Sequence, residues 1–266
     1  MADRQIPTAL SIAGSDSGGG AGIQADLKAF ARCGVHGMTA ITAITAQNTV
    51  GVEAVEAVSP PVIVAQVRAV AEDIGVDAVK IGMLGTAETV EAVVEALSFV
   101  GEAPVVIDPV MVAESGAELL DEEARVALAE KLLPLAAVVT PNIPEARALT
   151  GLGGEATQAE LARVLVEMGA KAAVVTGGHS EDVIDVFYDG HEVIEIAGER
   201  HPDGAAHGSG CTHSSSLAAF LALGREPLAA AEGAREITSQ AVRDGLREIG
   251  AGAGPVDVFG LMAGDF

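Results

Sequence analysis

Short apolar runs alternate with longer amphipathic segments from the N-terminus to about residue 180. The runs have the length of buried strands, and the segments between them have the period of helices. This alternation predicts an α/β fold with a mostly parallel central sheet covered by helices on both faces. The expected strands are 7–13, 37–45, 77–81, 103–108, 136–140 and 172–176, and the expected helices are 23–33, 60–74, 87–100, 121–132, 144–149 and 158–168.

The pattern changes after residue 180. Two apolar runs, 182–188 and 191–196, flank Asp189-Gly190, a dipeptide typical of two-residue hairpin turns. We therefore expect a small antiparallel hairpin at one end of the sheet, followed by helices over 211–225 and 227–247. Because no linker or repeat interrupts the chain, residues 1–266 are expected to form a single domain.

The chain is strongly acidic, with 38 acidic and 15 basic residues and a formal charge of −23. Such a surface repels nucleic acid and anionic membranes, so we expect neither as a partner. The acidic residues are scattered over the expected helix faces, a composition typical of a halophilic protein in a salty cytosol. Without a targeting signal, a membrane-length apolar run or closely spaced cysteines, the chain is expected to be cytoplasmic.

The loop at 207–212, His-Gly-Ser-Gly-Cys-Thr, leads into an expected helix of small residues. Glycines let backbone N–H groups converge, and a helix N-terminus favours negative charge, so this loop suits a phosphoryl group in transfer. The alternative is an ordinary tight turn. Cys211 is expected to have a lowered pKa at this helix N-terminus and to sit where a base would contact an attacking hydroxyl, unless it is only a small buried residue.

Polar residues also follow other expected strands, where ligands of open α/β sheets bind. A glycine-rich loop over 14–22 matches neither the dinucleotide fingerprint nor the P-loop, so ATP would need another architecture. Asp26 and Gln47 are expected at the mouth of the sheet, where the Gln47 amide suits a nitrogen heterocycle, although local turn bonds are the alternative. Asn142 and Glu145 offer oxygens that suit Mg²⁺ through water, but Glu145 also suits the first turn of a helix.

Seven segments occur in an order that resembles the hydroxymethylpyrimidine/phosphomethylpyrimidine kinases of the ribokinase superfamily. The resemblance covers nearly the whole chain. It implies a ribokinase-like fold, a homodimer, and ATP-dependent phosphorylation of 4-amino-5-hydroxymethyl-2-methylpyrimidine and then of its monophosphate, for thiamine synthesis. The segments are 13–28, 45–49, 80–84, 108–111, 140–146, 176–179 and 207–212.

The resemblance also implies roles for individual residues. Gln47 would pair with the aminopyrimidine, and the acceptor pocket would be completed by Gly14, Asp26, Met83 and Asp108. Mg²⁺ and the ATP phosphates would lie near Asn142 and Glu145, with Lys80, Thr176 and Gly178 also on the ATP side. The anion hole would be formed by Gly208, Ser209, Gly210 and Cys211, with Cys211 as base or orienting group.

Two residues depart from the family pattern. Thr176 stands where lysine is common, which leaves Lys80 or Mg²⁺ to supply positive charge, and Ser209 replaces a threonine while keeping its hydroxyl. Two other functions stay open. One is a pyridoxal or pyridoxine kinase of the same superfamily, and the other is a sensor that binds the pyrimidine without turnover.

Overall fold

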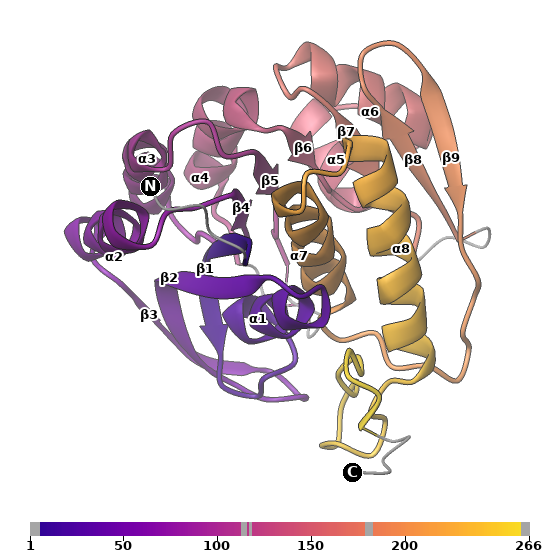
Figure 1. The fold of residues 1–266 in the computed structure, drawn as a ribbon. Helices are drawn as coiled ribbons and strands as arrows, with labels where there is room; N and C mark the ends of the chain where they lie inside the picture. Colours follow the sequence, from indigo (N-terminus) through magenta and orange to yellow (C-terminus); the bar gives the residue numbers. More distant parts are fainter. Residues whose placement is uncertain (1–5, 113–115, 117–118, 179–182, 262–266) are drawn as a thin grey trace.

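The computed structural model describes residues 6–112, 116, 119–178 and 183–261. Its nine strands form one sheet in the order β3-β2-β1-β4-β5-β6-β7-β8-β9 (Figure 1). In this order, each neighbouring pair from β2 through β1, β4, β5 and β6 to β7 is parallel. At one edge β3 pairs antiparallel with β2, and at the other β8 pairs antiparallel with both β7 and β9. The bounds are β1 (Thr8–Asp16), β2 (His36–Gln47), β3 (Val52–Ala57), β4 (Ala78–Ile81), β5 (Val105–Ile107), β6 (Val138–Val139), β7 (Ala173–Val175), β8 (Ile184–Tyr188) and β9 (Val193–Ala197).

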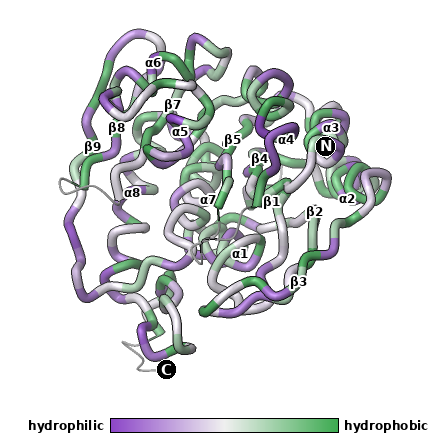
Figure 2. The backbone as a smooth tube through the Cα atoms, turned by 180° about the vertical axis from the view of Figure 1, so that it is seen from behind, coloured by the Kyte–Doolittle hydropathy of each residue, from purple (hydrophilic) through white to green (hydrophobic). Residues whose placement is uncertain are grey.

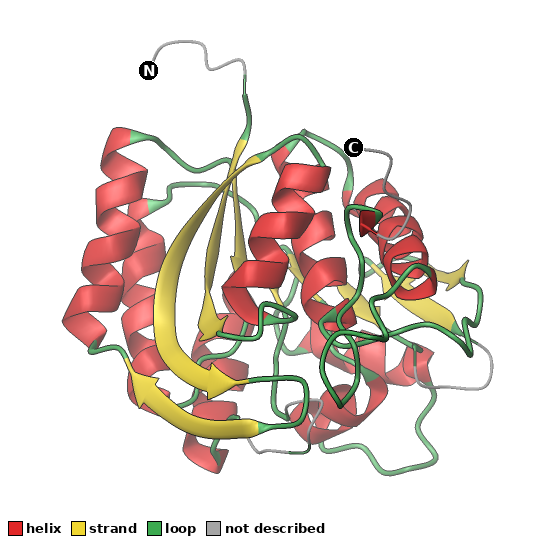
Figure 3. Ribbon diagram, turned by 90° about the horizontal axis from the view of Figure 1, so that it is seen from below, coloured by secondary structure: helices red, strands yellow, loops and turns green. Residues whose placement is uncertain are grey.

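Helices cover both faces of the sheet, as predicted (Figure 3). One face packs against α1 (Gly22–Arg32), α7 (Ser209–Ala222) and α8 (Pro227–Arg243). The other face packs against α2 (Pro60–Asp73), α3 (Ala87–Ala96), α4 (Glu122–Ala127), α5 (Ile143–Thr150) and α6 (Gln158–Glu167). Within the described residues, no helix has the length and apolar character needed to cross a membrane.

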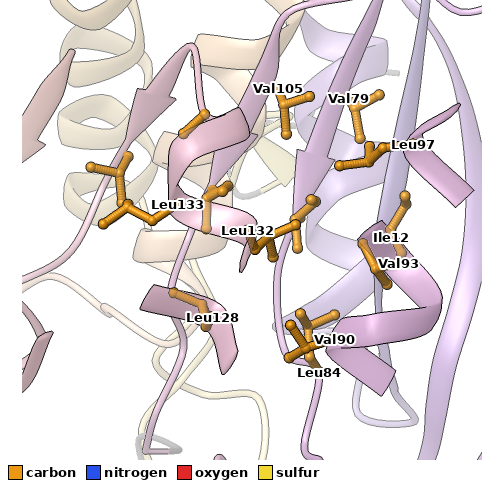
Figure 4. Close-up of a cluster of buried hydrophobic side chains, with 14 of the residues drawn as sticks. Ile12, Val79, Leu84, Val90, Val93, Leu97, Val105, Leu128, Leu132 and Leu133 are labelled. Atoms are coloured by element: carbon orange, nitrogen blue, oxygen red, sulfur yellow. The ribbon is translucent and has the colours of Figure 1, made fainter. Parts of the chain in front are cut away.

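Side-chain alternation along the strands builds two cores. Leu10 and Ile12 of β1 face the α2–α6 layer, whereas Ala9 faces the layer of α1, α7 and α8. Larger aliphatic residues fill the first core (Figure 4). The second core contains many alanines, which let α7 approach β1, β4 and β5 closely and let α8 pack closely on α7. Coloured by hydropathy, the central strands β4 and β5 are mainly hydrophobic (Figure 2).

Two predictions of secondary structure were incomplete. The strand β3 was not predicted, because nearly all of its residues are exposed and it carries glutamates instead of an apolar run. The expected helix over 121–132 is interrupted: α4 ends at Ala127 and continues as a π-helical turn (Leu128–Leu132) and a 3₁₀ turn (Leu133–Leu135). Asp182, the expected start of the hairpin, and His179 of the 176–179 segment lie outside the described residues.

The topology places the loops that carry the predicted site residues at one edge of the sheet, at the carboxyl ends of the parallel strands. The chain leaves β1 toward β2 on one side, while β4 flanks β1 on the other, so the strand order reverses at β1 and β4. Ligands of open α/β sheets bind at the carboxyl ends of strands beside such a reversal. The N-terminus of α7 reaches the same edge.

Candidate active site

A cavity of about 200 Å³ lies at this edge of the sheet. Asp26 is the one predicted site residue that is absent from its wall. The predicted residues that line it are Gly14, Gln47, Lys80, Met83, Asp108, Asn142, Glu145, Thr176, Gly178, Gly208, Ser209, Gly210 and Cys211. Residues from seven separate sequence segments therefore meet in one place.

Asp26 was predicted at the mouth of the sheet, but this prediction is wrong, because the residue is fully buried and does not line the cavity. The side chain is fully buried and accepts hydrogen bonds from Ser11 Oγ at 2.5 Å and Ser215 Oγ at 2.6 Å. Its Oδ1 also lies 2.9 Å from Nζ of Lys80. Asp26 thus acts on the cavity through Lys80, because it has no exposed surface with which to contact a ligand.

Lys80 is a buried cation between two carboxylates. Its Nζ pairs with Asp26 and lies 3.9 Å from Oδ2 of Asp108. Burial alone would lower the pKa of Lys80, but the charge of Asp26 raises it above the ordinary value. Burial raises the pKa of Asp108, and Lys80 and the hydroxyl of Ser214 limit the rise. The charge of Lys80 is therefore already balanced by protein groups, which weakens its assignment as the main phosphate cation.

The loop before α7 has the geometry of an anion site. Gly208 has φ +82°, and α7 begins at the next residue. The first intrahelical bond runs from Thr212 N–H to the Gly208 carbonyl, so the amides of Gly210 and Cys211 precede it and point out of the helix end. A Cβ on Gly208 would lie 1.8 Å from the carbonyl oxygen of Gly20, so only glycine fits. These amides can bind a phosphoryl group.

The expected low pKa of Cys211 is wrong. Cys211 as a residue is half-buried in the cavity wall, but burial of the thiol raises its pKa to about 12, and the positive charge of Lys80 offsets only part of this rise. The helix N-terminus does not overcome the loss of water. Cys211 is therefore a neutral thiol near pH 7 in the ligand-free protein.

The glycine-rich loop is shaped by Asp16, a residue that the sequence analysis did not single out. Its carboxylate accepts the N–H groups of Gly18, Gly20 and Ala21 at 2.8–3.0 Å. Oδ2 also lies 3.3 Å from Nε2 of His207, at the start of the anion loop. An aspartate between the predicted strand at 7–13 and a glycine run was the available signal.

Asn142 and Glu145 form a capping box at the start of α5. Each side chain accepts the other's backbone N–H at 2.9 Å. Burial, and after it the charge of Asp108, raises the pKa of Glu145 to about 8. Two carboxylates facing one cavity favour a cation between them, and their oxygens suit Mg²⁺ held through water. Asn142 and Glu145 therefore cap α5, as the alternative interpretation predicted, and their oxygens also fit a Mg²⁺ ion held through water.

A second group of side chains missed by the sequence analysis lines the cavity near Thr176 and Gly178. It consists of Asp185, His213 and Arg235. Asp185 is an ionisable residue between apolar neighbours in a strand, which was the available signal of a buried charge. The partners Arg235 and His213 come from distant helices and could not be inferred from spacing.

Comparisons with known proteins agree with this geometry. Residues 16–257 match the family model for phosphomethylpyrimidine kinase. A Rhizobium meliloti protein named hydroxymethylpyrimidine/phosphomethylpyrimidine kinase is 49% identical over 257 residues, covering 94% of this chain and 96% of that protein. An ADP complex of Bacillus subtilis pyridoxal kinase matches with a TM-score of 0.88 and 37% identity, over 98% of this chain and 100% of that one. A phosphomethylpyrimidine kinase from Clostridium difficile 630 matches with a TM-score of 0.78 and 40% identity, over 89% and 99%. The likeness confirms the predicted ribokinase-like fold.

Proposed function

Because this chain belongs to the phosphomethylpyrimidine kinase family, we propose that the cavity at the carboxyl ends of β1 and β4 is its kinase active site. The enzyme uses ATP to phosphorylate 4-amino-5-hydroxymethyl-2-methylpyrimidine and then the monophosphate, for thiamine biosynthesis. One observation carries the assignment of the site: residues from seven segments converge on a cavity that also contains the amides of the anion loop.

The pyrimidine binds on the side of the cavity formed by β1, β2 and β4. A Cβ on Gly14 would lie 2.7 Å from Cε of Met83, so these two residues form one continuous wall. Gln47 is half-buried beside them and accepts a hydrogen bond from Thr45 Oγ1. Its amide NH₂ is a donor that suits a ring nitrogen, while Met83 supplies an apolar surface for the ring.

Phosphoryl transfer takes place over the N-terminus of α7. The amides of Gly210 and Cys211 stabilise the charge on the transferred group, and the helix dipole adds to their effect. The acceptor oxygen forms a bond to phosphorus as the bond to the ADP oxygen breaks. The hydroxyl proton passes late, in a loose transition state, to an oxygen of the transferred phosphoryl group. The neutral Cys211 thiol orients the acceptor hydroxyl and is not its initial base.

Asn142 and Glu145 would hold Mg²⁺ through water, and the ion would supply positive charge to neutralise the ATP phosphates. The capping box already fixes both side chains, so little further ordering would be needed to hold the ion. Thr176 and Gly178 form the neighbouring wall toward ATP.

The remaining expectations concern the environment and assembly of the protein. We infer one domain over residues 1–266, in a cytoplasmic protein that requires salt to screen its charge of −23. A homodimer, which the family resemblance implies, would bury exposed apolar side chains at this edge of the sheet, such as Ile44 of β2 on one face and Val55 of β3 on the other. Light scattering after gel filtration, at low and molar KCl, tests both the dimer and the salt requirement.

Phosphorus NMR tests the reaction. Protein in molar KCl is mixed with Mg-ATP and the hydroxymethylpyrimidine, and a parallel sample receives pyridoxal. Successive appearance of the pyrimidine monophosphate and diphosphate is the expected result. Phosphorylation of pyridoxal alone would favour the second candidate, which the TM-score of 0.88 to a pyridoxal kinase supports. Binding of the pyrimidine without either product would indicate a sensor.

A further inference from the structure

Three buried polar side chains lie at one end of the cavity and have no role in the chemistry above. Asp185 of β8, His213 of α7 and Arg235 of α8 are 0%, 4% and 8% exposed. All three line the cavity beside Thr176 and Gly178. A buried carboxylate and a buried guanidinium both lose hydration, so their presence in a cavity wall needs a reason.

Asp185 holds the backbone of this wall. Its Oδ1 accepts the N–H of Gly177, two residues after β7, at 2.9 Å. The same oxygen lies 3.6 Å from Nη1 of Arg235, and Oδ2 lies 3.7 Å from Nε2 of His213. The carboxylate therefore fixes the residue between Thr176 and Gly178, both of which face the cavity.

Arg235 is itself fixed in place. Nη2 donates to the carbonyl of Val183 at 3.0 Å. The guanidinium lies against Gly198, where a Cβ would come within 1.9 Å of Nη2. Burial lowers the pKa of His213, so it stays neutral and Arg235 is the cation that balances Asp185. The contacts of Arg235 with Val183 and Gly198 thus help to orient the Asp185 carboxylate toward the Gly177 N–H.

We propose that Asp185, supported by Arg235, is a positioning residue for ATP, because its hydrogen bond to Gly177 fixes the Thr176–Gly178 wall against which the nucleotide binds. This inference rests on the proposed function, which assigns that wall to ATP. The pyrimidine wall is formed elsewhere, by Gly14 in β1 and by Met83 in the loop after β4. Loss of the hydrogen bond should therefore affect ATP more than the pyrimidine.

A comparison of two double variants isolates this hydrogen bond. Asp185→Asn with Arg235→Met removes both charges together and keeps an oxygen that can accept the Gly177 N–H. Asp185→Ala with Arg235→Met removes the same charges and also the acceptor. We expect the KM for ATP to be about tenfold higher in the alanine variant than in the asparagine variant, with pyrimidine KM and kcat differing less than about threefold.

Asp77→Ala is a matched control, since this carboxylate also accepts a backbone N–H, that of Thr8, but lies away from the cavity. Asp77→Ala should change neither the KM for ATP nor the KM for the pyrimidine. Equal ATP KM values in the two double variants, or a parallel rise for both substrates, would overturn the proposal. If the alanine variant does not fold, hydrogen exchange at Gly177 in nucleotide-free wild-type protein decides: slow exchange supports the proposal and unprotected exchange refutes it. Absence of pyrimidine phosphorylation by the wild type would instead refute the proposed function.

Discussion

Nε2 of His207 lies 3.3 Å from Oδ2 of Asp16, although 191 positions separate the two residues in the chain. The same carboxylate accepts the amides of Gly18, Gly20 and Ala21. One side chain therefore shapes the glycine-rich loop and fixes it to the start of the anion loop. In the proposed active site, this contact would hold the pyrimidine wall and the phosphoryl site in register.

Asp16→Asn should weaken both the hydrogen bonds to the glycine-rich loop and the contact with His207. The asparagine NH₂ group is a donor and cannot accept the loop amides, which leaves at least one of them unpaired. We expect kcat/KM for the pyrimidine to fall about 30- to 100-fold in steady-state assays. Asp189→Asn is the control, because Asp189 also accepts two amides but in an exposed turn, and it should leave kcat/KM unchanged. A small effect at Asp16 would show that the loop keeps its shape without the carboxylate.

Gly208→Ala and Gly210→Ala should differ although both lie in the anion loop. Alanine at 208 would need a φ of +82° and a Cβ 1.8 Å from the Gly20 carbonyl, whereas a Cβ on Gly210 meets no atom within 4 Å. We expect Gly208→Ala to destabilise the protein by about 2–4 kcal/mol in urea unfolding. Gly210→Ala should change stability by less than about 1 kcal/mol. Equal stabilities would contradict the close approach of the two loops.

Lys80→Met should be strongly destabilising because it leaves Asp26 and Asp108 buried without their cation. Breaking a buried ion pair in this way costs about 3–5 kcal/mol. Lys131→Met is the matched change at an exposed pair with Glu91 and should cost less than about 1 kcal/mol. Both values come from urea unfolding at pH 7. Similar losses for the two variants would show that the buried carboxylates do not depend on Lys80.

Glu145→Gln should alter how stability depends on pH. The pKa of Glu145 is about 8 in the folded protein against an ordinary 4.5, so the folded state holds this proton more tightly. The resulting stabilisation is complete below pH 4.5 and is lost as the pH rises to about 8. Without metal or nucleotide, the wild-type Tm should therefore fall more steeply between pH 5 and 8 than that of Glu145→Gln, which keeps an acceptor for the Asn142 amide.

Glu160 provides the control for this measurement. It occupies the same capping-box position in α6, but it is exposed, and hydrogen bonds from Thr157 lower its pKa. Its contribution is present above the ordinary pKa and is lost only at lower pH. Glu160→Gln should therefore not flatten the Tm profile between pH 5 and 8. The same flattening in both variants would mean that Glu145 is not the titrating group.

Cys211 should react slowly with iodoacetamide at pH 7.5. A rise in pKa from 9.0 to about 12 lowers the thiolate fraction, and the higher nucleophilicity of the thiolate offsets part of this. The net effect is a rate about 30- to 50-fold below that of an ordinary thiol. Mass spectrometry of the peptide, with the unfolded protein as reference, measures the ratio. Alkylation of the folded protein at the unfolded rate would contradict the raised pKa of Cys211.

The parts of the fold that the sequence predicted are those encoded by neighbouring residues. Buried parallel strands such as β5 are apolar throughout, and the loops after them carry the candidate site residues, so both could be located from local pattern. The strand β3 could not, because its exposed residues lack an apolar run. The pKa of Cys211 and the position of Asp26 depend on burial by distant segments, which no local pattern records.

The start of the anion loop is hydrogen-bonded to a segment near the C-terminus, which is synthesised last. His207 N–H donates to the Gly254 carbonyl and Val256 N–H to the His207 carbonyl, while Gly252 packs against Thr49. A ribosome must therefore translate through residue 256 before the anion loop acquires its last backbone partners. Until then a nascent chain that holds all the other site residues lacks these two backbone hydrogen bonds to His207.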